Sequence, residues 1–218
     1  MDGLILARIA PQDSRIALLK ERGVPFVALG RQQNDPGDYS LLDVDSGAAF
    51  VEAVKRLAAL GHRHIGLVSI TDDLSFARHR DDATVSTAQS LGLKVTRIAA
   101  ARADREGRLR GIPKLLSGPD RPTAILGLVD EIALDALNIA AEMGLSVPRD
   151  LSVIGFDDIA GAAHSTPPLS TFQPYNRRLG QKAAHVLADL IARPDSASVQ
   201  LLATAEFVER ASHGPAPG

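Results

Sequence analysis

The chain has 218 residues, with 24 lysines and arginines against 26 aspartates and glutamates, and its net charge is −2. This balance argues against a protein that coats DNA or RNA, because such proteins carry a basic excess. Hydrophobic residues make up 45% and charged residues 23%, which fits a globular chain and excludes a disordered one. Since there is no cysteine, disulfides, thiolate catalysis and cysteine-ligated zinc are also excluded.

Short apolar segments alternate with amphipathic ones along nearly the whole chain. Apolar residues spaced three and four apart predict helices at Gly47–Leu60, Glu131–Met143 and Leu179–Ile191. The alternation predicts an α/β fold, in which parallel sheets are flanked by helices. The predicted strands are Gly3–Ala7, Phe26–Leu29, Ser40–Val44, His64–Ser69, Lys94–Ala99, Ala124–Leu128, Leu151–Phe156 and Val199–Ala203, with one more near Phe207.

The start of the chain does not resemble a signal peptide. The first residues, MDGLILARIAP, have neither a basic region nor a long apolar one, and no segment has the roughly 18 apolar residues of a membrane span. We therefore expect a cytoplasmic protein with no membrane partner. Residues 211–218, ASHGPAPG, are predicted to form a disordered tail.

Polar side chains follow three of the predicted strands. Arg80 comes soon after His64–Ser69, Asp130 follows Ala124–Leu128, and Asp157 follows Leu151–Phe156. Open parallel sheets bind ligands at the carboxyl ends of their strands. Carboxylates accept hydrogen bonds from hydroxyl groups and arginine donates in a planar fork, so this mixture suits a small molecule rich in hydroxyls.

Each of these signals also has a purely structural interpretation. The pair Asp157 and Asp158 could form a turn or a helix cap, and Arg80 could be a solvated surface arginine. The stretch Arg102–Lys114 is best interpreted as a solvated helix face rather than a nucleic-acid patch. His62-Arg63-His64 is interpreted as a turn entering a strand, and no metal site is expected.

Catalytic and cofactor motifs are missing from the sequence. It has no G-x-G-x-x-G, no G-x-x-x-x-G-K-[ST], no G-x-S-x-G and no H-E-x-x-H. We therefore expect neither an enzyme nor a cofactor-binding protein.

Four segments resemble the LacI/GalR family of transcription regulators in order and spacing. LGHRHIGLV at Leu60–Val68 and VPRDLSVIGFDDI at Val147–Ile159 are similar to two of its signatures. PTAI at Pro122–Ile125, followed by Asp130, is similar to a third. TPPLST at Thr166–Thr171, followed by Gln173, is similar to a fourth. The resemblance extends over residues 1–210.

The resemblance implies a two-lobed, periplasmic-binding-protein-like effector domain. Residues 1–43 and 175–203 would form the N-terminal lobe, and residues 45–172 and 205–210 the C-terminal lobe. A small molecule, in this family most often a sugar, would bind in the interlobe cleft of a homodimer. It would thereby control the grip of a helix-turn-helix on operator DNA.

The chain departs from the family pattern in several places. Nothing like a helix-turn-helix precedes Met1, and the start of the N-terminal lobe is missing, so we expect the chain alone not to bind an operator. By resemblance the ligand-binding residues are Arg80, Asp157, Asp130 and Gln173. Ala103 stands where the family often has an aromatic residue that stacks on the ligand.

Two functions follow from these expectations. The first is the ligand-sensing domain of a LacI-type repressor. The alternative is a stand-alone sugar-binding protein derived from such a regulator, without DNA binding. Upstream genomic sequence would distinguish them, because an in-frame helix-turn-helix there supports the regulator.

Overall fold

The structure is a computed structural model that describes residues 2–35 and 37–218. The chain forms two compact units. The first comprises Met1–Asp45, Asp73–Arg78 and Tyr175–Ala205, and the second comprises Ser46–Asp72, His79–Pro174 and Glu206–Gly218. The segment Asp73–Arg78 departs from the expected boundaries, because its Ser75 amide donates a hydrogen bond of 2.9 Å to the Ile9 carbonyl oxygen in the first unit.

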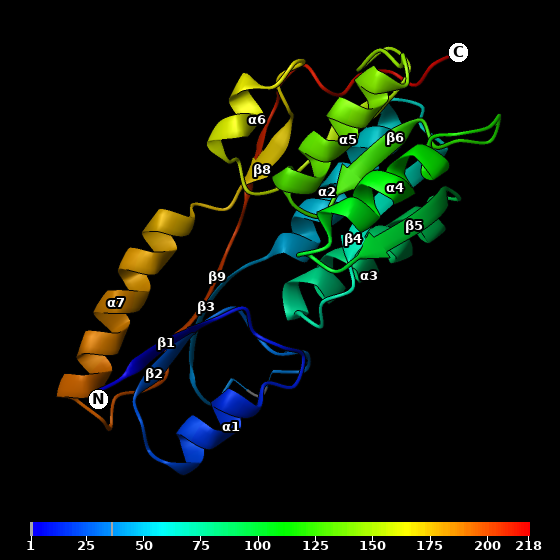
Figure 1. Ribbon diagram of the computed structural model, residues 1–218. Helices are drawn as coiled ribbons and strands as arrows, with labels where there is room; N and C mark the ends of the chain where they lie inside the picture. The colour runs from blue at the N-terminus through cyan, green and yellow to red at the C-terminus, as the bar shows by residue number, and fades with distance from the viewer. Residues whose placement is uncertain (1, 36) are drawn as a thin grey trace. The chain divides into compact units, whose positions relative to one another are not determined.

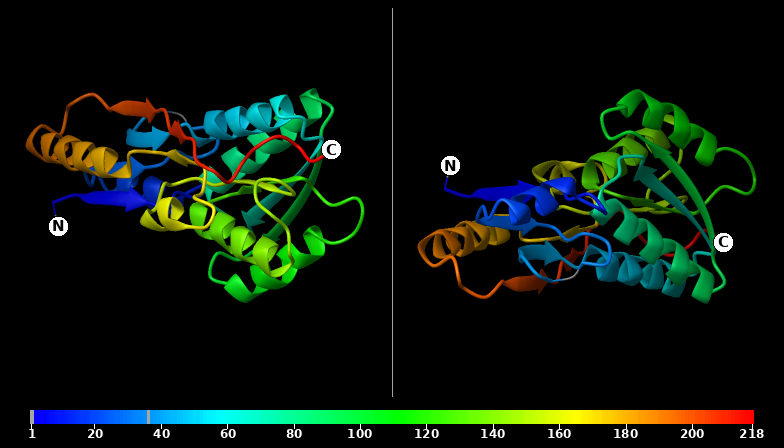
Figure 2. Two further views of the ribbon diagram at one scale, coloured as in Figure 1. Left: turned by 90° about the horizontal axis from the view of Figure 1, so that it is seen from above. Right: turned by 90° about the horizontal axis from the view of Figure 1, so that it is seen from below.

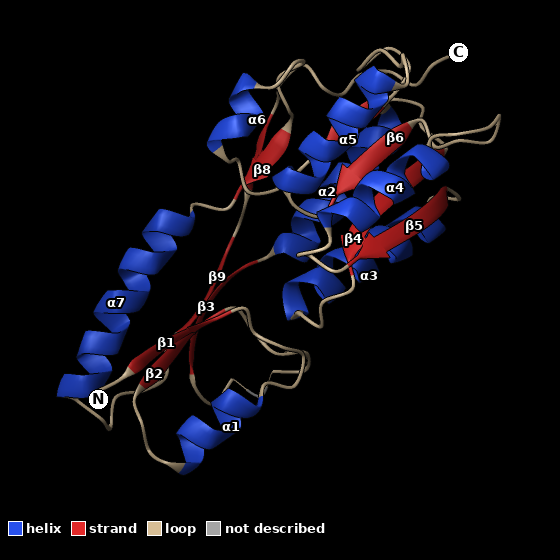
Figure 3. Ribbon diagram, viewed as in Figure 1, coloured by secondary structure: helices blue, strands red, loops and turns tan. Residues whose placement is uncertain are grey.

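The first unit is built on a parallel sheet with the strand order β1-β2-β3-β9. Its helices are α1 (Ser14–Glu21) and α7 (Asn176–Ala192). Side chains alternate between the faces of a strand, and the two helices pack against alternate residues. Figure 3 shows the sheet with these helices. The strands are β1 (Leu4–Ala7), β2 (Phe26–Leu29), β3 (Ser40–Val44) and β9 (Gln200–Ala203).

Two apolar clusters cover the two faces of this sheet. Ile16 and Leu19 of α1 pack with Ala28 and Leu41, whereas α7 packs against their neighbours in the strands, including Leu42. The outer strands are less well covered. Ile5 on β1 and Leu202 on β9 are 41% and 50% exposed.

The second unit contains a parallel sheet with the strand order β5-β4-β6-β7. Figures 1 and 2 show α4 and α5 on one face of this sheet and α2 and α3 on the other. Its strands are β4 (His64–Ile70), β5 (Lys94–Ala100), β6 (Ala124–Gly127) and β7 (Ser152–Ile154). Its helices are α2 (Ser46–Ala59), α4 (Arg105–Leu115), α5 (Asp130–Glu142), α6 (Ala160–His164) and, from His79 on, α3 (Ser75–Ser90).

A short antiparallel pair completes the second unit. Strand β8 (Thr171–Gln173) pairs with β10 (Glu206–Val208), with Phe172 opposite Phe207. A single parallel bridge between Ile154 and Ser170 joins this pair to β7.

Residues 211–218 are not the disordered tail that their glycines and prolines predict. Ser212 is fully buried; its hydroxyl group donates to the Val153 carbonyl oxygen at 2.6 Å and accepts from the Ser170 amide at 2.8 Å. Further along, the Ala216 amide donates to the Leu60 carbonyl oxygen at 2.8 Å. This segment therefore provides hydrogen-bond partners for buried backbone groups of Val153 in β7 and of Ser170. We call residues 210–216 the C-terminal strap.

The predicted fold class is confirmed: the chain is an α/β protein with two parallel sheets flanked by helices. Among the described residues, no helix has the length and apolar character needed to cross a membrane.

Candidate ligand-binding site

The four predicted site residues all lie in the second unit, at or beyond the carboxyl ends of its strands. Arg80 is on α3, Asp130 begins α5, Asp157 follows β7, and Gln173 ends β8. Parallel strands bring their carboxyl ends to one edge of the sheet, which is why residues separated in sequence meet there.

Asp157 is the half-buried carboxylate of this edge. Its amide donates a hydrogen bond of 2.9 Å to the Phe172 carbonyl oxygen, and its φ of 121° lies in the left-handed region. No hydrogen bond to its carboxyl group occurs within the described residues 2–35 and 37–218. Burial raises the pKa of Asp157 to about 6, while the positive charge of Arg80 acts in the opposite direction.

Arg80 is a fixed cation beside this carboxylate. Its side chain is almost completely buried, and Nη1 donates to the Leu128 carbonyl oxygen at 2.5 Å. The guanidinium carbon lies 3.8 Å from the centre of the Phe156 ring and 5.7 Å from that of Phe50. Cation–π contact and the hydrogen bond together hold the group in one orientation.

Asp130, predicted to contact the ligand, is hydrogen-bonded within the protein. It is fully buried; Oδ1 accepts from the Thr171 hydroxyl at 2.5 Å and Oδ2 from the Ile159 amide at 3.0 Å. A Cβ atom at Gly155 would lie 2.2 Å from Asp130 Oδ1, so only glycine fits there. Burial raises the pKa of Asp130. Asp130 therefore joins the start of α5 to β8 and to the residue before α6.

Gln173, also predicted to bind the ligand, is hydrogen-bonded to a neighbouring carboxylate. Its Nε2 donates to Oδ2 of Asp158 at 3.0 Å. The other oxygen of Asp158 accepts from Nη2 of Arg210 at 2.6 Å. Arg210 was not predicted as a site residue, since it lies 52 residues after Asp158 and no local pattern marks it.

Arg102 and Glu131 form the charged rim around Asp157. Their charged atoms are 3.6 Å apart, and Arg102 lowers the pKa of Asp157 while Glu131 raises it. The Arg102 amide is anchored by Oδ2 of Asp72 at 2.6 Å. Neither residue was predicted to belong to the site.

The helix after Arg102 is not the fully solvated face that its charges predict. Arg108 is only 6% exposed, and its Nη1 donates to the Arg102 carbonyl oxygen at 2.7 Å. Its Nε lies 3.7 Å from Oδ2 of Asp135 on α5. Helix α4 is therefore attached to α5 through a buried ion pair.

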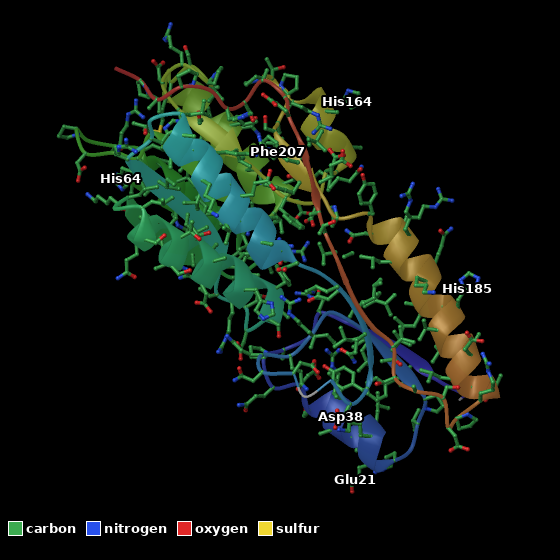
Figure 4. All side chains as sticks on the ribbon, turned by 180° about the vertical axis from the view of Figure 1, so that it is seen from behind. Glu21, Asp38, His64, His164, His185 and Phe207 are labelled. Carbon is green, nitrogen blue, oxygen red and sulfur yellow. The ribbon has the colours of Figure 1, made fainter. Side chains whose placement is uncertain are left out.

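Metal ligation has no support in the residues that the structure describes, where no group of three or more histidines, aspartates or glutamates could hold an ion. Figure 4 shows His64 and His164 far apart in the second unit. His62 is buried between the Thr123 hydroxyl at 2.9 Å and the Gly214 carbonyl oxygen at 3.0 Å, and burial lowers its pKa. Its position is structural.

The second unit thus presents an acceptor carboxylate beside an immobile guanidinium group, with further charges around them. Asp157 can accept hydrogen bonds from hydroxyl groups, and the rim can both donate and accept. These hydrogen-bonding groups are suited to recognising a small polar molecule.

Residues 54–213 match the family model described as a periplasmic binding protein-like domain. The chain belongs to this family. Its resemblance to LacI-type regulators is confirmed by the proteins it matches. It is 32% identical over 223 residues to the HTH-type transcriptional regulator AglR of Rhizobium meliloti, an alignment that covers all of this chain and 62% of AglR.

Solved structures agree with this assignment. A LacI family regulator of Enterococcus faecium with bound ribose superposes with a TM-score of 0.86 at 26% identity, over 99% of this chain and 80% of that one. The complex of the regulator CelR with cellobiose gives a TM-score of 0.87 at 26% identity, over 97% of this chain and 66% of CelR.

Proposed function

We propose that the chain is the ligand-sensing domain of a LacI-type transcription regulator and binds a sugar or a similar polyhydroxyl compound. The observation that carries this proposal is Asp157. It is a half-buried carboxylate with a raised pKa, held beside the fixed Arg80 without a hydrogen bond from any described residue. A buried charge is costly unless it is paired, so a group of this kind points to a ligand.

The ligand class is supported by the hydrogen-bonding capacity of the site and by two relatives. Solved structures similar to this chain hold ribose in one case and cellobiose in the other. Sugars present several hydroxyl groups, which a carboxylate accepts and a guanidinium group complements. We propose binding without catalysis, since the relatives that the chain matches are transcriptional regulators.

In the whole regulator, ligand binding would be coupled to operator binding. We propose that the chain acts as a homodimer and contacts operator DNA only through a helix-turn-helix, which we do not find in its 218 residues. Coupling of this kind changes affinity by a free energy of about 1–3 kcal/mol.

Calorimetric titration with ribose, cellobiose and a panel of other mono- and disaccharides tests the proposal. The Asp157→Asn variant should bind the best sugar about 10 to 100 times more weakly, because a charge-assisted hydrogen bond contributes about 1.5–3 kcal/mol. Arg80→Lys should also weaken binding, since lysine has no planar fork. Glu106→Gln changes an exposed carboxylate on α4 and should leave affinity unchanged. The absence of binding by every sugar would contradict the proposal.

A further inference from the structure

Asp157 and Asp158 are neighbours in sequence with opposite surroundings. Both carboxylate oxygens of Asp158 accept hydrogen bonds from the protein, one from Arg210 at 2.6 Å and one from Gln173 at 3.0 Å. The Asp157 carboxyl group accepts none from the described residues. Because both oxygens of Asp158 are held by hydrogen bonds, Asp158 can fix the backbone position of Asp157.

The backbone at this pair needs to be fixed in this way. Asp157 has a φ of 121° and Asp158 a φ of 49°, both in the left-handed region. Residues other than glycine adopt these angles at a cost, and they remain there only when surrounding contacts enforce them. The contacts present are the bond from the Asp157 amide to the Phe172 carbonyl oxygen and the two bonds to Asp158.

Arg210 begins the C-terminal strap and is itself fixed at three points. Its amide donates to the Ser170 hydroxyl oxygen at 2.9 Å, Nη1 donates to the Leu169 carbonyl oxygen at 2.8 Å, and Nη2 donates to Asp158. Two residues later, Ser212 ties the strap to Val153 and Ser170. The guanidinium group therefore bridges the residues just before β8 and the turn after β7.

From these contacts we infer that Arg210 is the positioning residue of the ligand site: by clamping Asp158 it holds the turn that keeps Asp157 partly buried beside Arg80. This inference rests on the proposed function, because it assigns Arg210 to the same site. Arg210 does not touch the ligand; it acts through Asp158. The C-terminal strap is thus a part of the binding machinery.

The charge balance at the edge supports the same assignment. Arg210 lowers the pKa of Asp130, whereas Asp158 raises it. The edge thus holds three carboxylates, Asp130, Asp157 and Asp158, and two arginines that offset their negative charge. Arg80 acts on Asp157, and Arg210 acts on Asp130 and Asp158. Removing Arg210 would release the turn and leave Asp158 in a half-buried position without its cation.

The test uses the 218-residue chain and needs no ligand. The titration midpoint of the Asp157 carboxyl group is measured by carbon NMR in the unchanged chain and in Arg210→Met. We expect the midpoint to fall from about 6 toward about 4, because Asp157 loses its burial when the turn relaxes. Arg210→Lys should give an intermediate midpoint, since lysine keeps the charge but cannot bridge Leu169 and Asp158. This variant also serves where Arg210→Met does not fold.

Arg121→Met is the matched control. Arg121 also donates to backbone carbonyl oxygens in the second unit, those of Asp150 at 3.0 Å and Pro122 at 3.3 Å. Its loss should lower the melting temperature without moving the Asp157 midpoint. A midpoint in Arg210→Lys and Arg210→Met within about 0.3 unit of the unchanged chain would overturn the inference. A shifted midpoint in a chain that binds no sugar would support the positioning role and contradict the proposed function alone.

Discussion

In each unit a carboxylate follows a strand of the parallel sheet. The two carboxylates, Asp13 and Asp157, differ in their hydrogen bonds and in the direction of their pKa shifts. Asp13, after β1, accepts hydrogen bonds from the Ala10 and Arg15 amides at 3.0 and 3.1 Å and from the Arg15 guanidinium group at 2.6 Å. The bond from Arg15 lowers the pKa of Asp13. Asp157, after β7, has no such donor in the described chain, and burial raises its pKa to about 6. We infer that a carboxylate with hydrogen-bond donors in the protein, such as Asp13, stabilises the fold. A carboxylate without them, such as Asp157, is kept for a ligand.

The two units also differ in how many charged side chains they bury. Of the charged side chains that the described residues bury, only Asp13 lies in the first unit. Arg80, Arg108, Asp130 and Asp135 all lie in the second. Asp135 and Arg108 form an ion pair, and Asp130 accepts two hydrogen bonds, so among these four Arg80 is the charge that lies beside Asp157.

The largest expected loss of stability comes from a substitution at Gly155, which lies against Asp130 in the second unit. Gly155→Val would place a side chain against Oδ1 of Asp130 and separate that carboxylate from Thr171. We expect the free energy of unfolding to fall by about 4 kcal/mol, measured by urea denaturation.

The control for this substitution lies on α7 in the first unit. Nothing lies within 4 Å of a Cβ atom at Gly180, and Gly180→Ala should stabilise the chain by about 0.5–1 kcal/mol. Equal effects of the two substitutions would remove the distinction between the units.

Ser212→Ala tests whether the C-terminal strap belongs to the second unit. The substitution leaves the Ser170 amide and the Val153 carbonyl oxygen without their buried partner, and we expect a loss of about 2 kcal/mol in urea denaturation. Ser196→Ala, at an exposed turn of the first unit, should change stability by less than about 0.5 kcal/mol. A strap that is truly disordered would make both substitutions neutral.

Asp13→Ala should cost about 1–2 kcal/mol at pH 7, because it removes the cap of α1 and the bond from Arg15. The pKa of Asp13 is lower in the folded chain than in the unfolded one, so its contribution is present above about pH 4 and is lost as the pH falls further. Urea denaturation between pH 3 and 7 should show the two chains converging in acid. Asp38→Ala removes only an exposed pair with Lys20 and should have little effect at any pH.

Much of the fold could be predicted because apolar periodicity depends on nearby residues alone. The strands Phe26–Leu29 and Ser40–Val44 have the predicted bounds. Elements of three to eight residues, such as β8, α6 and α1, carry too few apolar positions for a periodic pattern. Residues 211–218 were predicted to be disordered from their composition, which contains no information about the backbone groups that β7 leaves open.

The site was harder to predict than the fold. The rule for parallel sheets brought Arg80 and Asp157 to one edge. It could not show that Asp130 and Gln173 are engaged with other residues of the protein, because hydrogen-bond partners are a matter of three-dimensional packing. For the same reason Arg210, Arg102 and Glu131 were missed.

The most direct test of the account compares Asp157→Asn with Asp158→Asn by urea denaturation at pH 7 and pH 4.5. The folded-state pKa of Asp157 is about 6, above its unfolded value, so its ionisation destabilises the fold above that pH and not below about pH 4. Asp157→Asn should therefore stabilise the chain by about 1–2 kcal/mol at pH 7, with a smaller gain at pH 4.5. Asp158→Asn should destabilise it by about 2 kcal/mol, because Arg210 loses its charged partner. If both variants lost stability equally at pH 7, with no change in their difference from the unchanged chain at pH 4.5, Asp157 would not be the carboxylate kept for a ligand.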